Sequence, residues 1–400
     1  MNSLNVPQLR FSGFEGEWEN KTLFDISKEV SYGMNAAAKT FDGIHKYIRI
    51  TDIDSDSRKF NPNPLTSPEG DIDERFKLKI NDIVFTRTGA SVGKSYLYNE
   101  DDGALYYAGF LIKFSITNAN SYFIFCQTLK ESYDKWVQVN SMRSGQPGLN
   151  AEEYKSLNMS IPSLSEQQKI ASFLSAVDEK KQQLSRKKEL LEQYKKGVMQ
   201  QLFSGKLRFK DENGKDYPDW EKVNGNILFE SISNKNHNSD LPILAITQEH
   251  GAIPRDLIDY TVSVTDKSID SYKVVEIGDF VISLRSFQGG IEYSNYKGIC
   301  SPAYIILRPT SENVNKLFYK TYLKTSSYIK ELQKNLEGIR DGKMISYKYF
   351  SDIKLPFPSL PEQQKIANFL SGIDGKIEQV NGELVKTQEF KKGLLQQMFV

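Results

Sequence analysis

Hydrophobic residues recur at the heptad step along two stretches of the chain, with polar residues in the positions between them. In the first stretch they are Ile170, Phe173, Val177, Leu184, Leu191, Tyr194 and Val198, and in the second Ile366, Phe369, Ile373, Val380, Phe390 and Leu394. Such a narrow apolar stripe is typical of a long helix that pairs with another long helix. A helix from Ser165 to Ser204 would be roughly 60 Å long. Because a globular region separates the two stretches, we expect the helices to pair in antiparallel orientation.

The two stretches are copies of one another. Pro162–Phe203 begins PSLSEQQKIASFLS, and Pro358–Phe399 begins PSLPEQQKIANFLS. Aligned without a gap from their first serines, they agree at 20 of 41 positions, against roughly two or three expected by chance. Pro361 stands in the first turn of the second copy, where its missing N–H costs nothing, and Gly205 is the expected C-cap of the first. The sequence therefore predicts a tandem duplication in which a helical arm closes each half.

Each arm is preceded by a region with the pattern of a mixed α and β domain. Segments typical of strands lie at Lys46–Ile53 and between Phe76 and Ile116. A helix is expected from about Asn120 to Trp136, and the second half repeats this order with a helix from about Asn313 to Gln333. The predicted fold class is α+β, with two similar domains separated by two long antiparallel coiled-coil helices and a pseudo-twofold internal repeat. The predicted boundaries are 1–160 for the first domain, 161–205 for the first arm, 206–356 for the second domain and 357–400 for the second arm.

Composition and charge exclude several classes of function. The net charge of +1 argues against a protein that coats nucleic acid through bulk electrostatics, although Ser165–Lys210 carries eleven Lys or Arg against five Asp or Glu. Cys126 and Cys300 each lie in an apolar stretch, so we expect buried thiols. The three histidines lack the spacing of metal ligands. Without a signal-like start or a long apolar run, we expect a cytoplasmic protein that does not enter the membrane.

Three stretches resemble catalytic motifs, and each departs from its motif in a way that matters chemically. Gly89–Ser95 is one residue short of a phosphate loop, and strand-like residues follow it where a phosphate loop would open a helix. Asn61–Pro64 lacks the adjacent prolines and the aromatic residue of the adenine-binding loop of amino-methyltransferases. Asp178–Lys181 lies on the predicted helix, without strands that would converge its carboxylates on Mg²⁺. We therefore expect no catalytic activity in this chain.

Two short loops just before the arms carry arginine close to glycine. Arg143–Gly148 reads RSGQPG, and Arg340–Lys343 reads RDGK at the corresponding position of the second half. Glycine and arginine in a polar loop can bring a guanidinium and backbone amides close to a phosphate or a base edge. The same residues also occur in ordinary turns, so both interpretations stay open.

The architecture and one repeated motif indicate a function. Two recognition surfaces on a helical spacer suit double-stranded DNA, because the spacing of half-sites on a rigid duplex makes a fixed distance specific. The paired segments P-S-L-x-E-Q-Q-K-I-A-x-F-L-S, each followed by a helix ending K-K-G-x-x-Q-Q-x-F, resemble the two conserved regions of the specificity (S) subunit of type I restriction-modification enzymes. The resemblance covers the whole chain in its layout.

The resemblance implies a division of labour among subunits. Each variable module would be a target recognition domain that reads one half of a bipartite, asymmetric DNA site, and the paired helices would set the spacer between the halves. The S subunit of the family binds two methyltransferase (M) subunits, which methylate adenine at N6, and the complex recruits restriction (R) subunits. S-adenosylmethionine, ATP and Mg would then belong to the partner subunits, and this chain would hold no cofactor or metal.

Candidate functional residues follow from loop position and from the repeat. The candidates for contacts with DNA are Arg87, Lys94, Arg143, Gln146, Arg285, Gln288, Arg340 and Lys343. Arginine suits bidentate contact with guanine, and glutamine suits adenine. The resemblance also makes the polar start of each arm a candidate for docking the methyltransferase subunits. These residues are Glu166, Gln167, Gln168, Lys169, Glu362, Gln363, Gln364 and Lys365.

Two other interpretations remain open from the sequence. The chain could be a non-enzymatic coiled-coil scaffold whose modules bind peptides, which predicts no DNA affinity that depends on spacer length. It could also be a stand-alone DNA-binding regulator, which would bind its split site without a methyltransferase. The target bases, the spacer length and the assignment of modules to half-sites do not follow from the sequence.

Overall fold

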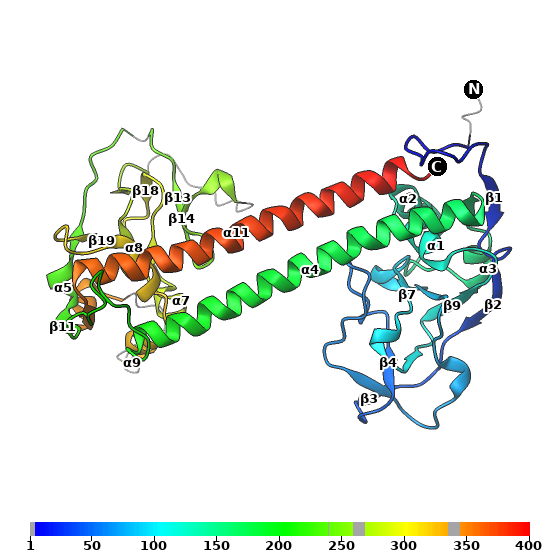
Figure 1. Cartoon of the computed structure of the whole chain (residues 1–400), viewed down its shortest axis with the longest axis horizontal. Helices are drawn as coiled ribbons and strands as arrows, with labels where there is room; N and C mark the ends of the chain where they lie inside the picture. The colour runs from blue at the N-terminus through cyan, green and yellow to red at the C-terminus, as the bar shows by residue number, and fades with distance from the viewer. Residues whose placement is uncertain (1–4, 239, 259–268, 335–344) are drawn as a thin grey trace. The chain divides into compact units, whose positions relative to one another are not determined.

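The computed structural model describes residues 5–238, 240–258, 269–334 and 345–400. The chain divides into two compact units, one made of residues 1–185 with 382–400 and the other of residues 186–381. Each unit holds one α+β module together with part of both long helices (Figure 1). Each module is therefore folded against both arms.

The first module is organised around a four-stranded antiparallel sheet with the strand order β2-β9-β6-β7. Smaller pairs join β1 to β10, β3 to β5 and β4 to β8. The strands are β1 (Glu19–Thr22), β2 (Ser27–Tyr32), β3 (Ala38–Thr40), β4 (Lys46–Ile48), β5 (Thr66–Pro68), β6 (Asp82–Thr86), β7 (Ser95–Leu97), β8 (Leu105–Tyr107), β9 (Leu111–Ile116) and β10 (Asn158–Ile161). Every residue of β6 and β9 is buried, as expected for central strands that are covered on both faces.

The second module repeats this sheet with the strand order β12-β19-β16-β17. Its strands are β11 (Glu221–Asn224), β12 (Phe229–Ile232), β13 (Leu244–Thr247), β14 (Gly251–Pro254), β15 (Lys273–Val275), β16 (Phe280–Ile282), β17 (Glu292–Tyr293), β18 (Gly298–Cys300), β19 (Ile305–Pro309) and β20 (Lys354–Phe357). The repeat therefore includes the strand order of the central sheet, although the two modules differ in sequence.

Short helices follow the sheet in both modules. They are α1 (Ser121–Gln127), α2 (Glu131–Asn140) and α3 (Ala151–Lys155) in the first, and α8 (Lys316–Tyr322), α9 (Ser326–Lys334) and α10 (Tyr347–Asp352) in the second. The second module has two more short helices, α5 (Gly225–Leu228) just before β12 and α7 (Ser286–Gly289) between β16 and β17. Asn120 and Asn315 cap α1 and α8, because the side-chain oxygen of each asparagine accepts from the backbone N–H of the residue three positions later. The same start signal thus opens the equivalent helix in each module.

The sequence-based prediction of a single helix after each sheet is wrong. In place of Asn120–Trp136 the chain forms α1 and α2, and in place of Asn313–Gln333 it forms α8 and α9. At the first break the hydroxyl of Thr128 donates to the carbonyl of Phe125 at 2.7 Å, and at the second Thr325 donates to Tyr322 at the same distance. A side chain that bonds back to the preceding turn competes with continuation of the helix. A further correction concerns Lys46–Ile53, of which Lys46–Ile48 alone is a strand.

The two long helices confirm the heptad prediction. Helix α4 (Leu164–Phe203) and helix α11 (Leu360–Gln397) each run without a break. In the second unit they pair in antiparallel orientation, because Lys188 contacts Asn381 at 2.8 Å while Lys195, further along α4, contacts Asp374, earlier in α11, at 2.5 Å. Gly205, with φ of +74°, ends α4 in the left-handed conformation expected of a C-cap glycine.

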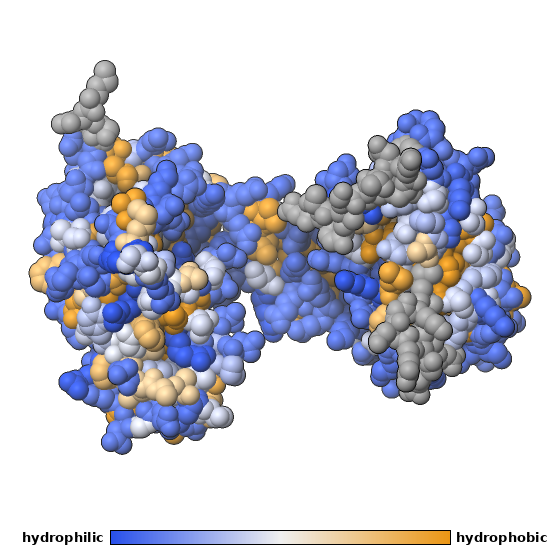
Figure 2. Space-filling model, turned by 180° about the vertical axis from the view of Figure 1, so that it is seen from behind, coloured by the Kyte–Doolittle hydropathy of each residue, from blue (hydrophilic) through white to orange (hydrophobic). Residues whose placement is uncertain are grey.

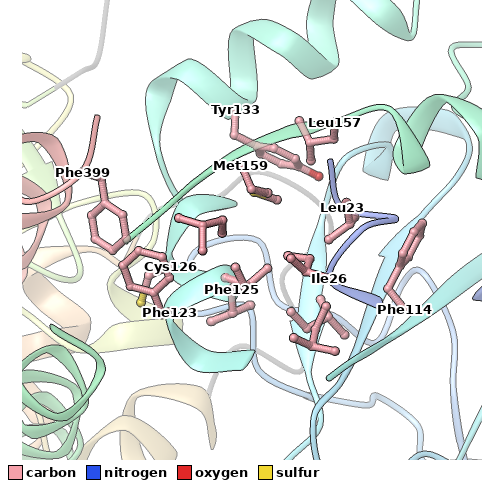
Figure 3. Close-up of a cluster of buried hydrophobic side chains, with 14 of the residues drawn as sticks. Leu23, Ile26, Phe114, Phe123, Phe125, Cys126, Tyr133, Leu157, Met159 and Phe399 are labelled. Carbon is pink, nitrogen blue, oxygen red and sulfur yellow. The ribbon is translucent and has the colours of Figure 1, made fainter. Parts of the chain in front are cut away.

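An aromatic side chain at or just after the end of each long helix packs into a module. In the first unit Phe399 lies against Phe123 of α1, with 5.0 Å between ring centroids (Figure 3). In the second unit Phe203 lies against Phe318 of α8 at 5.5 Å. The first cluster also contains Cys126, which is fully buried, so the prediction of a buried thiol is confirmed there as it is for Cys300.

Figure 2 shows a face of the protein on which hydrophilic residues predominate and hydrophobic residues form small, scattered groups. Among the described residues, no helix is long and apolar enough to cross a membrane, and no three or more His, Cys, Asp or Glu side chains gather in a way that could hold a metal ion. Strand β7 (Ser95–Leu97) begins at the last residue of the apparent phosphate loop, so the prediction that a strand rather than a helix follows this loop is confirmed.

Candidate nucleic-acid interface

The loop after β6 carries the first candidate, Arg87. Its guanidinium lies over the ring of Tyr32, with 4.8 Å between Cζ and the ring centroid. Its backbone N–H donates to the carbonyl of Phe110 at 3.0 Å, and its own carbonyl accepts from the N–H of Leu149 at 2.8 Å. The half-buried side chain is thus oriented by a cation–π contact on a backbone fixed from both sides.

The loop that carries Gln146 lies directly beside the loop of Arg87. The N–H of Gly89 donates to the carbonyl of Pro147 at 3.0 Å. Gly89 has φ of +71°, and a Cβ atom at this position would lie 2.8 Å from Nε2 of Gln146. The positive φ favours glycine at this position, and the short distance shows how closely the side chain of Gln146 approaches the loop. The structure therefore brings together two stretches that the sequence analysis selected separately.

The other two candidates of the first module already have intramolecular partners. Arg143 is exposed, forms an ion pair with Glu153 and donates to the carbonyl of Asn140 at 2.9 Å. Lys94, at the far end of the Arg87 loop, donates from Nζ to the carbonyl of Ile53 at 3.2 Å. These contacts hold both cations near the loops without burying them.

In the second module the equivalent loop forms α7. Arg285 and Gln288 are both exposed on it. The side-chain amide of Gln248 donates to the carbonyl of Arg285 at 3.2 Å, which brings the turn between β13 and β14 against this loop. Gln248 was not selected from the sequence, where its only signal is a polar turn between two apolar segments. Arg340 and Lys343 lie outside the described residues.

At the start of α4, two of the proposed docking residues are buried and have partners within the first unit. The carboxylate of Glu166 is 1% exposed and accepts two hydrogen bonds from the guanidinium of Arg10, at 2.7 and 2.8 Å. These hydrogen bonds raise the pKa of Arg10. The side chain of Gln167 donates to the carbonyl of Pro162 at 2.8 Å and accepts from the N–H of Asn120 at 2.9 Å. Together they fasten the first residues of the module and the cap of α1 to the arm.

The start of α11 repeats these contacts in the second unit. The buried carboxylate of Glu362 accepts from Arg208 at 3.1 and 2.9 Å and from the indole N–H of Trp220 at 2.9 Å. Gln363 donates to the carbonyl of Pro358 at 2.8 Å and accepts from the N–H of Asn315 at 2.9 Å. We call the Arg10–Glu166 and Arg208–Glu362 contacts the two clasps. Leu-Arg-Phe occurs near the start of both modules, at 9–11 and at 207–209, and this repeat is the signal in the sequence that could have found the clasps.

The remaining docking candidates lie nearer the surface. Gln168, Lys169 and Gln364 are exposed and Lys365 is half-buried. The ammonium of Lys169 lies 5.6 Å from the ring centroid of Phe11, and Lys365 donates to the carbonyl of Lys210 at 2.7 Å. Each arm therefore presents a small polar patch beside its clasp.

The comparisons with known proteins bear on this duplicated arrangement. The family model of the type I restriction modification DNA specificity domain matches residues 15–193 and 220–386, which cover most of each module and of the helix that follows it. The chain belongs to this family. As predicted from the repeated motif, it is a specificity subunit of the type I restriction-modification kind, and the match in two parts reflects its internal repeat.

Relatives of this specificity subunit extend over its full length. The MjaX type I restriction enzyme specificity subunit of Methanocaldococcus jannaschii, a provisional assignment, is 28% identical over 95% of this chain and 92% of its own. The MjaVIII specificity subunit of the same organism is 25% identical over 99% of this chain and 93% of its own. The crystal structure of the S subunit of a type I restriction-modification system from M. genitalium superposes with a TM-score of 0.61 at 17% identity, covering 99% of both chains. This likeness establishes the fold.

Proposed function

We propose that this chain recognises a bipartite, asymmetric site on double-stranded DNA, with each module reading one half. The observation that carries the proposal is the duplication of the module down to its hydrogen bonds, combined with loops whose side chains differ. The loop after β6 carries Arg87 and Lys94, whereas the equivalent loop after β16 carries Arg285 and Gln288. Equivalent scaffolds with different donors are what two unlike half-sites require.

The paired helices α4 and α11 set the spacer between the half-sites in this proposal. The rigidity of the helices supports this role, because polar contacts join each helix to the other and a clasp joins each helix to a module. The carboxylates of the clasps are buried and bound by guanidinium groups in bidentate geometry, which fixes orientation as well as distance. A helix held in this way can transmit a defined separation.

Partners supply the chemistry in this proposal. Two methyltransferase subunits dock near the exposed Gln168, Lys169 and Gln364 and the half-buried Lys365, and methylate adenine at N6, while restriction subunits join the full complex. The buried Glu166, Gln167, Glu362 and Gln363 would support docking by positioning each arm rather than by direct contact. The chain itself is non-catalytic, holds no cofactor and acts in the cytoplasm, where its DNA lies; S-adenosylmethionine, ATP and Mg belong to the partners.

Methylome sequencing tests this function directly. Cells that make the chain together with its methyltransferase subunits are compared with cells that lack the chain alone. We expect N6-methyladenine at one bipartite motif in the first cells and its loss in the second. Methylation that is unchanged without the chain would overturn the proposal and favour a scaffold, whereas DNA binding without any change in methylation would favour a stand-alone regulator.

A further inference from the structure

The second module carries a two-stranded ribbon with an exposed polar tip. Strands β13 and β14 pair in antiparallel register, with Thr247 opposite Gly251. The three residues of the turn between them are Gln248, Glu249 and His250, and all three are exposed. A two-stranded β-ribbon is one of the few protein elements that fit the major groove of B-DNA. The ribbon therefore has a shape and side chains that suit reading of base edges.

The ribbon is fixed to the module at its root. Leu244 and Ala252 are buried in the core cluster beneath it, and Ala252 forms a β-bridge with Ser294. Gly251 has φ of +72°, and a Cβ atom there would lie 2.6 Å from the carbonyl oxygen of Tyr293. The backbone of Gly251 therefore packs directly against that of Tyr293, which joins the base of the turn to the rest of the module.

The tip is also joined to the loop that carries Arg285. The amide nitrogen of Gln248 donates to the carbonyl of Arg285 at 3.2 Å. The backbone carbonyl of Gln248 accepts from Nζ of Lys324 at 3.4 Å, and Lys324 forms an ion pair with Glu292, which is 1% exposed. A Cβ atom on Gly289 would lie 2.6 Å from the side-chain amide of Gln248. Three segments of the module therefore converge on this glutamine.

The hydrogen bond to the carbonyl of Arg285 orients the side-chain amide of Gln248 but uses only one of its hydrogen-bonding groups. A glutamine side chain has two amide protons and a carbonyl oxygen, so one proton and the oxygen of Gln248 remain for the paired contact that recognises adenine. The carboxylate of Glu249 can accept from N4 of cytosine, and the guanidinium of Arg285 suits guanine. Adjacent positions thus carry complementary chemistry for three different bases.

We propose that the β13–β14 ribbon enters the major groove of one half-site and that Gln248 and Glu249 determine base preference there, beside Arg285. This inference rests on the proposed function and adds to it a specific reading element. The equivalent part of the first module holds a turn at 54–59 instead, with the N–H of Asp54 donating to the carbonyl of Lys59 at 3.0 Å. The ribbon therefore governs the half-site of the second module alone.

The test is selection of bound sequences from a randomised duplex library by the complex of the full chain with its methyltransferase subunits. With Gln248→Ala, we expect one position of one half-site to lose its preference for adenine, because alanine removes the amide without placing a carboxylate against the carbonyl of Arg285. With Glu249→Ala, one position should lose its preference by roughly 5- to 150-fold. Glu212→Ala, an exposed glutamate in another turn of the same unit, is the matched control and should leave the motif unchanged.

The outcomes separate this inference from the proposed function. If the unaltered complex selects no bipartite motif, the proposed function itself fails. If it selects a motif that both variants reproduce, the function stands and the ribbon inference is overturned. Weaker binding with unchanged base preference would also overturn it, because a phosphate contact lowers affinity for all sequences alike.

Discussion

The ammonium of Lys391 lies 2.5 Å from the carboxylate of Asp178, joining α11 to α4 within the first unit. The hydroxyl of Tyr122 donates to the same carboxylate at 2.6 Å, so α1 of the module takes part as well. The second unit repeats the ion pair at 2.5 Å between Lys195 and Asp374, each 196 positions from its counterpart. Because a polar pair tolerates no shift along the helices, these two contacts fix the register of the antiparallel arms.

The two pairs differ in burial, and this difference predicts unequal costs of removal. The side chain of Lys391 is 9% exposed and that of Asp178 33%, whereas Asp374 is 52% exposed. Lys391→Ala should lower the free energy of unfolding by about 1–3 kcal/mol, because the partly buried carboxylate loses its hydrogen-bonded cation and keeps only the longer contact with Lys181 at 3.8 Å. Lys195→Ala is the matched variant and should cost under about 1 kcal/mol. Urea unfolding of the full chain measures both, and equal losses would contradict the argument.

The same pair predicts a dependence of stability on pH. Burial alone would raise the pKa of Asp178, but the charge and hydrogen bond of Lys391 outweigh it and place the pKa below its ordinary value. The stability that the pair contributes is therefore present above the pKa of the unfolded chain, about 3.9, and is lost as the pH falls through the folded pKa. The deficit of Lys391→Ala should thus be largest near neutral pH and shrink toward pH 3. Urea midpoints of both proteins across this range test it, and a constant deficit would argue against the pair.

The sequence predicts the arms well because their signal is local and periodic. The heptad residues, the absence of interior proline and the C-cap Gly205 are all read from neighbouring positions, and α4 ends within one residue of the predicted Ser204. The break between α1 and α2 was not predicted because the hydrogen bond by which Thr128 ends α1 is revealed only by the fold. No proline or glycine marks the break in the sequence, so nothing local indicates where one helix ends and the next begins.

The candidate site was less predictable because its contacts join distant residues. Glu166 and Glu362 looked like surface residues at helix starts, yet their partners Arg10 and Arg208 lie 156 and 154 positions away. The approach of Gln248 to Arg285 across 37 positions was equally hidden. The contact between the Arg87 loop and the Gln146 loop was hidden in the same way, because Gly89 and Gln146 lie 57 positions apart.

The clasp of the second unit predicts a large cost for the loss of its arginine. Arg208→Ala would leave the carboxylate of Glu362, which is fully buried, with only the indole of Trp220. Breaking such a buried pair costs about 3–5 kcal/mol. Arg208 also contacts Asp219, whose side chain is completely exposed, so Asp219→Ala should change stability by less than about 0.5 kcal/mol. Thermal unfolding of both variants decides the matter, and comparable shifts in Tm would show that the clasp contributes little.

The role of the arms predicts how the target site changes when both are lengthened together. Lys188 contacts Asn381, so one heptad inserted before Lys188 in α4 and one inserted after Asn381 in α11 face each other. Both ion pairs between the arms are then preserved, and each helix lengthens by roughly 10 Å. We expect the spacer of the methylated motif to lengthen by about 3 base pairs, since a base pair rises about 3.4 Å, with both half-sites unchanged.

A heptad in α4 alone would misalign Lys195 with Asp374 and should abolish methylation. Methylome sequencing measures the spacer in both variants. An unchanged spacer in the double insertion would show that the arms do not set the distance between the half-sites.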